Sequence, residues 1–442
     1  MNDVPTCGRE HQTYPDYRWI ILALLFLATT NVYLDRIVLG NVASTVKTDL
    51  GLNDQQYGYV VSAFQAGYAI GLLLVGRLMD RLGAKLGYVL AIAAWSVVTC
   101  LTSLTPTLAG LPVVQRLAGY GGLNAPLLML CVFQCALALT AAGNFPAAIK
   151  AVAEWFPVRQ RSLATSLFNS GPSVALVVGP PIIAWLMVKT GSWQLTFAVT
   201  GSVGFVLVAV WPFIYRKPTH MAVMAAPSAD TVRPARLRWS QLLVHRETVG
   251  IMIGKFCTDP VWYFYIAWLP SYLAKNRQFD IMEIGFTLPV IYGLAILGGN
   301  VAGWTAGFLI RRGWAPRNAR KIVMLTCALC MPLSAFAVYA RQPWVAILLI
   351  SLANAGHNGW SANIFTLVGD CFKPAAVGTV TGLIGFAGGV GGILISGLAS
   401  GFIIQHFGYV PIFLLMGALH PLAMLFVHFM VKPGEPIDPR ST

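Results

Sequence analysis

Apolar windows of roughly twenty residues, separated by short polar turns, recur along the whole chain. A helix of that length crosses the ~30 Å hydrocarbon core of a bilayer, whereas a barrel strand needs only about ten alternating residues. Because no water reaches that core, spanning segments must satisfy their own backbone groups, which favours helices. We therefore expect an all-α integral membrane protein with twelve transmembrane helices. The expected spans cover residues 17–41, 55–76, 86–104, 124–148, 162–188, 193–215, 247–274, 281–310, 322–340, 343–370, 375–404 and 409–431.

The composition excludes a soluble protein with a single anchor. Hydrophobic residues make up 57% of the chain and charged residues 10%, with a mean hydropathy of +0.68, whereas soluble domains carry roughly 25% charged residues. Met1–Asp16 lacks the pattern of a cleavable secretory leader, so we expect the first span to act as the insertion signal. Cys131/Cys135 and Cys327/Cys330 have helical spacing inside apolar segments, and the eight cysteines are expected to be small buried side chains. We expect no metal and no cofactor.

The net charge of +14 would suggest nucleic acid as a partner of a soluble protein, but in a membrane protein the positive-inside rule accounts for it. With the N-terminus inside, most of the 30 Lys and Arg residues fall on the cytoplasmic side. We therefore expect a multi-pass protein of the cell (inner) membrane with both termini cytoplasmic. The outer loops hold six basic residues, which are Lys47, Arg116, Lys189, Lys275, Arg277 and Arg341.

The longest polar stretch, Arg216–Arg246, divides the chain into two halves of six spans each. We expect it to be a basic cytoplasmic linker near anionic lipid, with a regulatory binding site as the alternative. Residues 105–123, rich in Pro and Gly, are expected to form an outer loop or interfacial piece. The expected domains are a cytoplasmic N-terminus, an N-terminal bundle, the linker, a C-terminal bundle and a cytoplasmic C-terminus, over residues 1–16, 17–215, 216–246, 247–431 and 432–442.

The two halves resemble each other. The segment "GRLMDRLGAK" follows span two, and "GFLIRRGWAPRNARK" follows span eight, its counterpart. Two related halves predict pseudo-symmetric six-helix bundles with a central site that opens to alternate sides of the membrane.

The segment "GRLMDRLGAK" resembles the G-x-L-x-D-R-x-G-x-[RK] signature of the major facilitator superfamily. The resemblance implies the major facilitator fold and a cytoplasmic gate motif. At a helix junction, Gly76 and Gly83 would allow a tight turn and close helix approach. Asp80, Arg81 and Lys85 would form a charge lock at the membrane face.

Other segments narrow the resemblance. "NVYLDR", "GNFPAAIKAVAEWFP", "FNSG", "KFCTDPVWYFYIAWLPSYL" and "GWSANIFTLVGD" are similar to the anion:cation symporter family, and within it to the hexuronate transporter branch. That family implies proton-coupled uptake of organic anions, typically sugar acids. Span four departs from the family pattern R-x-x-x-G-x-G-E-A, because Gln134 replaces the basic residue and Ala141 replaces the acid.

Asp35 and Arg36 lie side by side within the first apolar span. An ionisable side chain at the centre of a span costs ~2.5–3.5 kcal/mol on insertion scales, so the pair needs a cavity or partners. A wide polar sector facing a watery cavity would accommodate both, with a structural ion pair as the alternative. A guanidinium suits a carboxylate because it donates two parallel hydrogen bonds. The resemblance implies Arg36 as counter-charge of the anion, Tyr33 as a hydrogen-bond donor, and Asp35 as the proton-coupling site.

Further polar and aromatic side chains within spans are candidates for substrate binding, with helix packing as the alternative for each. Asp259 and His357 are further candidates for proton coupling. Lys255 is expected to extend toward the cytoplasmic interface. The substrate-binding candidates besides Tyr33 and Arg36 are Gln65, Tyr68, Asn169, Trp262, Tyr263, His357, Asn358 and Asn363.

The expected function is secondary active uptake of a sugar acid such as glucuronate or galacturonate, by proton symport through alternating access. Gln134 and Ala141 motivate one alternative, an uncoupled or differently coupled carrier of another sugar-like or carboxylate solute. A membrane-embedded sensor or enzyme is a remote alternative, because the spans contain no catalytic motif. The expected partners are a small anionic solute, protons and the lipid bilayer, without nucleic acid, and we expect a monomer.

Overall fold

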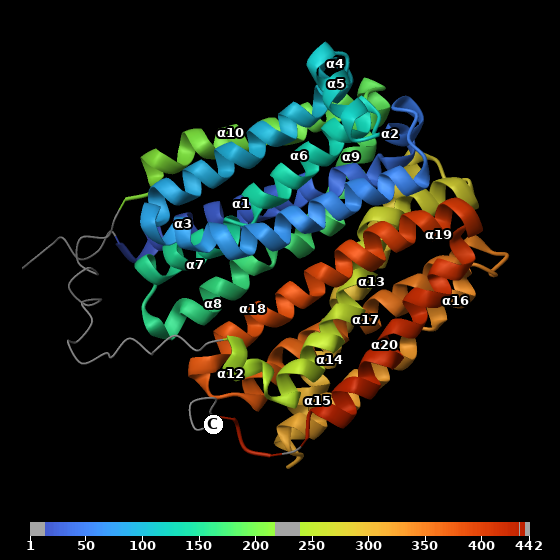
Figure 1. Ribbon diagram of the computed structural model, residues 1–442. Coiled ribbons are helices and arrows are strands. Elements are labelled where there is room, and N and C mark those ends of the chain that lie inside the picture. The colour runs from blue at the N-terminus through green and yellow to red at the C-terminus, as the bar shows by residue number, and fades with distance from the viewer. Residues whose placement is uncertain (1–13, 217–238, 433, 438–442) are drawn as a thin grey trace, which may run out of the picture.

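The computed structural model describes residues 14–216, 239–432 and 434–437. The chain folds into helices that run roughly side by side (Figure 1). In the part before the linker the helices are α1 (Tyr14–Asn41), α2 (Ala43–Asp49), α3 (Asp54–Ser103), α4 (Thr105–Ala109), α5 (Pro112–Tyr120), α6 (Ala125–Ala141), α7 (Asn144–Trp155), α8 (Val158–Asn169), α9 (Gly171–Thr190) and α10 (Trp193–Ile214).

After the linker the helical order is repeated. The helices are α12 (Trp239–Leu243), α13 (Arg246–Arg277), α14 (Ile281–Arg311), α15 (Pro316–Cys330), α16 (Leu333–Ala337), α17 (Pro343–Cys371), α18 (Pro374–Gly391), the π-helix η1 (Gly392–Ala399), α19 (Ser400–Phe407) and α20 (Tyr409–Met430). We call α1–α10 the N-terminal half and α12–α20 the C-terminal half. Figure 1 shows the two halves as blue-to-green and yellow-to-red groups lying against each other.

Nine helical stretches in the described part of the chain are long and apolar enough to cross a membrane. The α13 and α17 helices and residues 55–82 of α3 are of similar length but carry more polar side chains, and they complete the twelve crossings. Some crossings are built from two pieces, as in α6 with α7 and in α8 with α9. The expected all-α architecture of twelve crossings is confirmed.

The gate motif lies where α3 bends. The helix runs on past Gly76, and its only non-helical residue is Gly83, with φ 77° and ψ 168°. The tight turn of the motif is made by Gly83, whose positive φ favours glycine. The side chain of Asp80 lies outside those that the structure describes, so the charge lock with Arg81 and Lys85 stays a prediction.

The long helices share two ends. We call the end near α12 and Arg216 the linker end and the opposite end the α2 end (Figure 1). The short helices α4 and α5 lie at the α2 end, which agrees with an interfacial piece over residues 105–123. At the linker end, Arg317 of α15 donates to the carbonyl oxygens of Lys432 (2.7 Å) and Glu435 (2.8 Å) and so fastens the C-terminal segment. Residues 1–13 and 217–238, which contain most of the expected N-terminus and linker, lie outside the described residues.

Candidate functional site

The guanidinium of Arg36 on α1 lies among four aromatic rings. Its Cζ is 5.0–5.5 Å from the ring centroids of Tyr33, Phe64, Tyr68 and Tyr263. Three of these rings come from α1 and α3 in the N-terminal half, and Tyr263 comes from α13 in the C-terminal half. Aromatic faces stabilise a cation without neutralising it. The Nη2 atom of Arg36 is buried and has no hydrogen-bond partner among the described residues, so this cation retains a free donor.

A cavity of about 40 Å³ lies beside Arg36, between the two halves. Two further buried atoms of cavity-lining side chains have no partner among the described residues, Oε1 of Gln65 and Nε2 of Gln134. Small-molecule sites usually enclose about 300 Å³ or more, so this one is contracted in the present arrangement. Its lining residues are Arg36, Leu39, Gly40, Tyr57, Val60, Val61, Phe64, Gln65, Gln134, Tyr263, Ile266 and Ala267.

Arg36 also lines a second, smaller cavity of about 10 Å³. Tyr33, Tyr68 and Ala141 line it together with Asn144. Asn144 is committed elsewhere, because its Nδ2 donates to Oγ1 of Thr29 (3.2 Å). Ala141, which stands at the acidic position of the symporter pattern, therefore lies next to the Arg36 site but supplies no carboxylate.

Asp35 does not share the cavity with Arg36. Its side chain is 1% exposed, and Oδ2 accepts a hydrogen bond from Nδ2 of Asn31 (3.3 Å). Oδ1 has no partner among the described residues. Neighbouring helical residues point about 100° apart, and this rotation turns Asp35 into the N-terminal half. The expectation that one watery cavity accommodates both charges is therefore wrong.

Lys255 and Asp259 form a buried ion pair one turn apart on α13. Nζ of Lys255 lies 2.6 Å from Oδ1 of Asp259 and 4.0 Å from the ring centroid of Phe365. Only 3% of Lys255 is exposed. The expectation that Lys255 extends to the interface is wrong, because a carboxylate within reach binds the ammonium group inside the half.

A histidine pair lies in the C-terminal half. Nδ1 of His357 on α17 is 3.1 Å from Nε2 of His420 on α20, and the His357 ring stacks on Trp262 at 5.5 Å and 6°. Asn358 and Asn363 donate to carbonyl oxygens of their own helix at 3.2 Å and 2.9 Å. None of these side chains lines the two cavities that Arg36 lines.

The structure therefore separates the sequence candidates. Tyr33, Gln65, Tyr68 and Tyr263 gather with Arg36. Trp262 instead stacks on His357, and Asn358 and Asn363 bind the backbone of their own helix. Asn169 is exposed at the end of α8 and lines neither cavity. His420 was missed by sequence reasoning, because a single histidine in an apolar span carries no signal of its partner 63 residues away. No group of three or more His, Cys, Asp or Glu among the described residues is placed to hold a metal ion.

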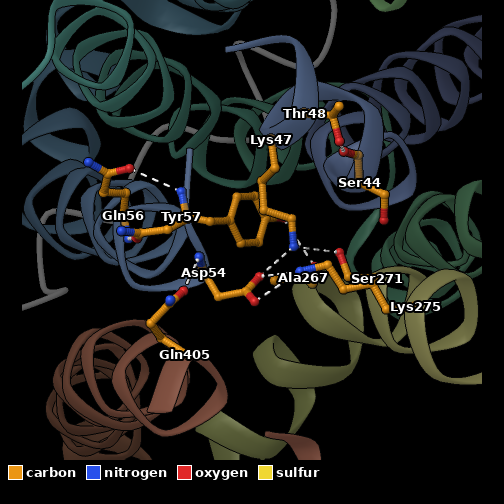
Figure 2. Close-up of polar contacts among 11 residues, drawn as sticks. Ser44, Lys47, Thr48, Asp54, Gln56, Tyr57, Ala267, Ser271, Lys275 and Gln405 are labelled. Carbon is orange, nitrogen blue, oxygen red and sulfur yellow. Dashed lines mark hydrogen bonds and ion pairs between the residues drawn. The ribbon is translucent and has the colours of Figure 1, made fainter. Parts of the chain in front are cut away.

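A charge cluster joins the two halves at the α2 end (Figure 2). Nζ of Lys47 on α2 lies 2.7 Å from Oδ1 of Asp54 at the start of α3 and donates to Oγ of Ser271 on α13 (3.3 Å). Lys275 of α13 binds the same carboxylate at 2.9 Å, and Gln405 of α19 accepts from the Asp54 backbone N–H (3.0 Å). One acidic residue thus ties α2 and α3 to two helices of the other half.

Lys47 is the most deeply buried charge of this cluster. Its exposed fraction is 4%, and Nζ lies 5.2 Å and 5.7 Å from the ring centroids of Tyr57 and Trp268. Burial lowers the pKa of Lys47 to about 8, although Asp54 acts in the opposite direction. The ammonium group is therefore held at a cost that one carboxylate only partly offsets.

The cluster adjoins the Arg36 cavity. Tyr57, which contacts Lys47, donates its hydroxyl to the carbonyl oxygen of Ala267 (3.1 Å), and both residues line the cavity. Further along α3, Oγ of Ser62 donates to the carbonyl oxygen of Ile393 (2.9 Å). These bonds join the two halves beside the cavity.

A family model described as Major Facilitator Superfamily matches residues 25–396. The chain belongs to the Major Facilitator Superfamily and is a multi-pass membrane transporter, not an enzyme.

Curated relatives match over most of the chain. The hexuronate transporter of Escherichia coli (strain K12) is 27% identical over 437 residues, covering 95% of each chain. A probable galactarate/D-glucarate transporter of Bacillus subtilis (strain 168) is 30% identical over 396 residues, covering 85% of this chain and 83% of the relative. A D-galactonate transporter of Escherichia coli O6:H1 is 26% identical over 420 residues, covering 91% of this chain and 93% of the relative.

Solved structures share the fold at low identity. A D-xylose-proton symporter superposes with a TM-score of 0.73 at 15% identity, covering 95% of this chain and 100% of that chain. A bacterial homologue of the human lysosomal transporter Spinster, in an inward-facing and unoccupied conformation, gives a TM-score of 0.71 at 16% identity, covering 94% and 96%. These similarities concern the fold alone.

Proposed function

We propose that this protein takes up sugar acids across the cell (inner) membrane by proton symport. The observation that carries the proposal is the free, buried donor of Arg36 beside a cavity lined by both halves. A cation that has no carboxylate partner among the described residues, in a site shared by two halves, is suited to a solute that brings its own negative charge. The relatives, which include hexuronate and D-galactonate transporters, support the choice of sugar acids.

In this proposal the carboxylate of the solute binds the guanidinium of Arg36. The planar fork donates two parallel bonds to a carboxylate, and the surrounding rings keep water away from the pair. Tyr33, Tyr68 and Tyr263 add hydroxyl groups and apolar faces for a sugar ring. Because Tyr263 belongs to the other half, binding of the solute would link the two halves.

We place the coupled proton on Asp35. Its Oδ1 atom has no partner among the described residues, and a buried carboxylate without a cation is costly when charged. The adjacent backbone links Asp35 to Arg36, so an anion that draws Arg36 into the cavity changes the field at Asp35. Asp259 and His357 are the further candidates, and the Lys255 ion pair and the His420 contact commit each of them to another group.

Alternating access follows from the position of the Lys47–Asp54 cluster. We propose that the linker end and both termini face the cytoplasm, so that the closed α2 end faces outward. The N-terminal bundle (17–215) and the C-terminal bundle (247–431) then move as two units around the Arg36 cavity, within a single chain that works as a monomer. Opening of either end enlarges the contracted cavity and admits the solute.

The decisive experiment measures uptake of labelled glucuronate and galacturonate into vesicles that contain the purified protein, with and without an inward proton gradient. We expect uptake that the gradient accelerates and drives to accumulation. Uptake of neither acid contradicts the substrate class. Uptake that ignores the gradient supports the second candidate function, an uncoupled or differently coupled carrier, which the uncharged Ala141 beside the cavity favours.

A further inference from the structure

We infer that the solute carries a single carboxylate and is otherwise hydroxylated, and that Gln134 and Gln65 select it. This inference rests on the proposed function and names the kind of sugar acid that the same site accepts. It concerns three atoms around one cavity: Nη2 of Arg36, Nε2 of Gln134 and Oε1 of Gln65. One is a charged donor, one a neutral donor and one a neutral acceptor.

The two amide groups are buried at a cost that a solute can remove. Gln134 is 2% exposed and Gln65 is 3% exposed, and a buried polar group without a partner costs about 1–3 kcal/mol. A hydroxyl group both donates and accepts, so it satisfies an amide oxygen and an amide nitrogen alike. A polyhydroxylated solute therefore completes the hydrogen bonding of both side chains.

The charge of the cavity admits only one carboxylate. Among the residues that line it in the described part of the chain, Arg36 is the sole charged one. Two other buried ammonium groups are already paired, because Lys255 binds Asp259 at 2.6 Å and Lys47 binds Asp54 at 2.7 Å. Neither of these lysines lines the cavity, so Arg36 alone is placed to neutralise an acid group of the solute.

A second carboxylate would therefore enter the cavity without a cation. Besides Arg36 it would meet only neutral lining residues, so charge pairing would not offset the loss of its hydration. A sugar with one acid group, such as a uronate or an aldonate, avoids this cost. An aldarate, which carries a carboxylate at each end, does not.

The test is competition against uptake of labelled glucuronate in vesicles that contain the wild-type protein. We expect unlabelled glucuronate, galacturonate and gluconate to inhibit at similar concentrations. Glucarate and galactarate should need concentrations at least about tenfold higher, which corresponds to about 1.4 kcal/mol. Equal inhibition by the dicarboxylates contradicts this inference alone. Absence of glucuronate uptake, with no inhibitor effect to measure, contradicts the proposed function instead.

The variant Gln134→Arg supplies the missing second cation. We expect it to lower the ratio of the inhibitory concentrations of glucarate and glucuronate by about tenfold. Gln115→Arg adds the same charge at an exposed position of α5 and should leave that ratio unchanged. A Gln134→Arg protein that takes up glucuronate without any gain for glucarate shows that Gln134 does not select the solute. If this variant does not fold, the wild-type competition still decides the inference.

Discussion

Arg36 combines a permanent positive charge with a free hydrogen-bond donor, so replacing it should lower the affinity for the solute. We expect Arg36→Ala to weaken inhibition of uptake by glucuronate, or its binding to purified protein, by about 100-fold, since bonds to a charged group contribute about 1.5–3 kcal/mol. Arg36→Lys keeps the positive charge but loses the planar guanidinium, so its affinity for glucuronate should lie between those of the wild type and Arg36→Ala. Arg116→Ala, at an exposed position of α5, serves as the control. Unchanged affinity in Arg36→Ala would show that the guanidinium only stabilises the aromatic rings.

Asp35 should affect coupling and leave solute exchange intact. The variant Asp35→Asn keeps the shape of the side chain and its contact with Asn31 but cannot take up and release a proton in the physiological range. We expect exchange of labelled for unlabelled glucuronate to continue, while accumulation driven by a proton gradient disappears. Both are measured in the same vesicles, with exchange as the internal control for folding. Normal accumulation would move the coupling site to Asp259 or His357.

The sequence was sufficient to locate Arg36 and Asp35, because ionisable residues in apolar spans are costly and therefore rare. It was not sufficient for Gln134, which differs from the symporter pattern but gains its meaning only from a cavity that α1, α3, α6 and α13 build together. The contact of His420 with His357 and the burial of the Lys255–Asp259 pair could not be predicted for the same reason, because the sequence of a span does not show which of its faces packs on which neighbouring helix.

Close contact of α3 with η1 depends on glycines without side chains. A Cβ atom at Gly58 would lie 2.6 Å from the carbonyl oxygen of Gly397 and 2.9 Å from Cα of Gly401. We expect Gly58→Leu to keep the α2 end from closing, so that glucuronate uptake falls by about tenfold or more while the protein still folds. Uptake and thermal unfolding of the purified protein are the measurements.

The matched control for that variant is Gly382→Leu on α18. A Cβ atom at Gly382 would meet nothing within 4 Å, so this change adds the same side chain without separating the halves. We expect its uptake to stay near that of the wild type. Wild-type uptake in Gly58→Leu would show that the α3–η1 contact is dispensable for transport.

The lengths of the apolar segments were sufficient to predict that helices form there. They did not predict where the helices end or break. The bend of α3 falls at Gly83 and not at Gly76, because only the backbone conformation shows which glycine leaves the helix. The π-helix η1 within the eleventh crossing also carries no sequence signal that distinguishes it from an α-helix. Such segments are frequent at functional sites, and η1 packs where the two halves meet.

The two halves as wholes were predictable from the repeated segments after spans two and eight, since repeated halves imply a central site. The contacts that hold the halves together were not predictable from the sequence. Lys47 and Lys275 counted as ordinary basic residues of outer loops, yet both bind Asp54 where the halves meet. Lys47 is buried where the halves meet, packed against Trp268 and Ser271 of the C-terminal half, so we expect closure of the α2 end to depend on pH.

The sign of that dependence follows from Lys47. Burial lowers its pKa from 10.5 to about 8, so between pH 8 and 10.5 the folded protein binds fewer protons than the unfolded chain. The free energy of unfolding should therefore rise with pH in this window, by at most about 3 kcal/mol. Lys47→Met removes the titrating group and should abolish this part of the rise. Thr48→Met, an exposed neighbour on α2, retains Lys47 and should keep the wild-type slope in thermal unfolding between pH 7 and 10.5. Identical slopes in wild type and Lys47→Met would show that the cluster does not bury a charged lysine when the halves close.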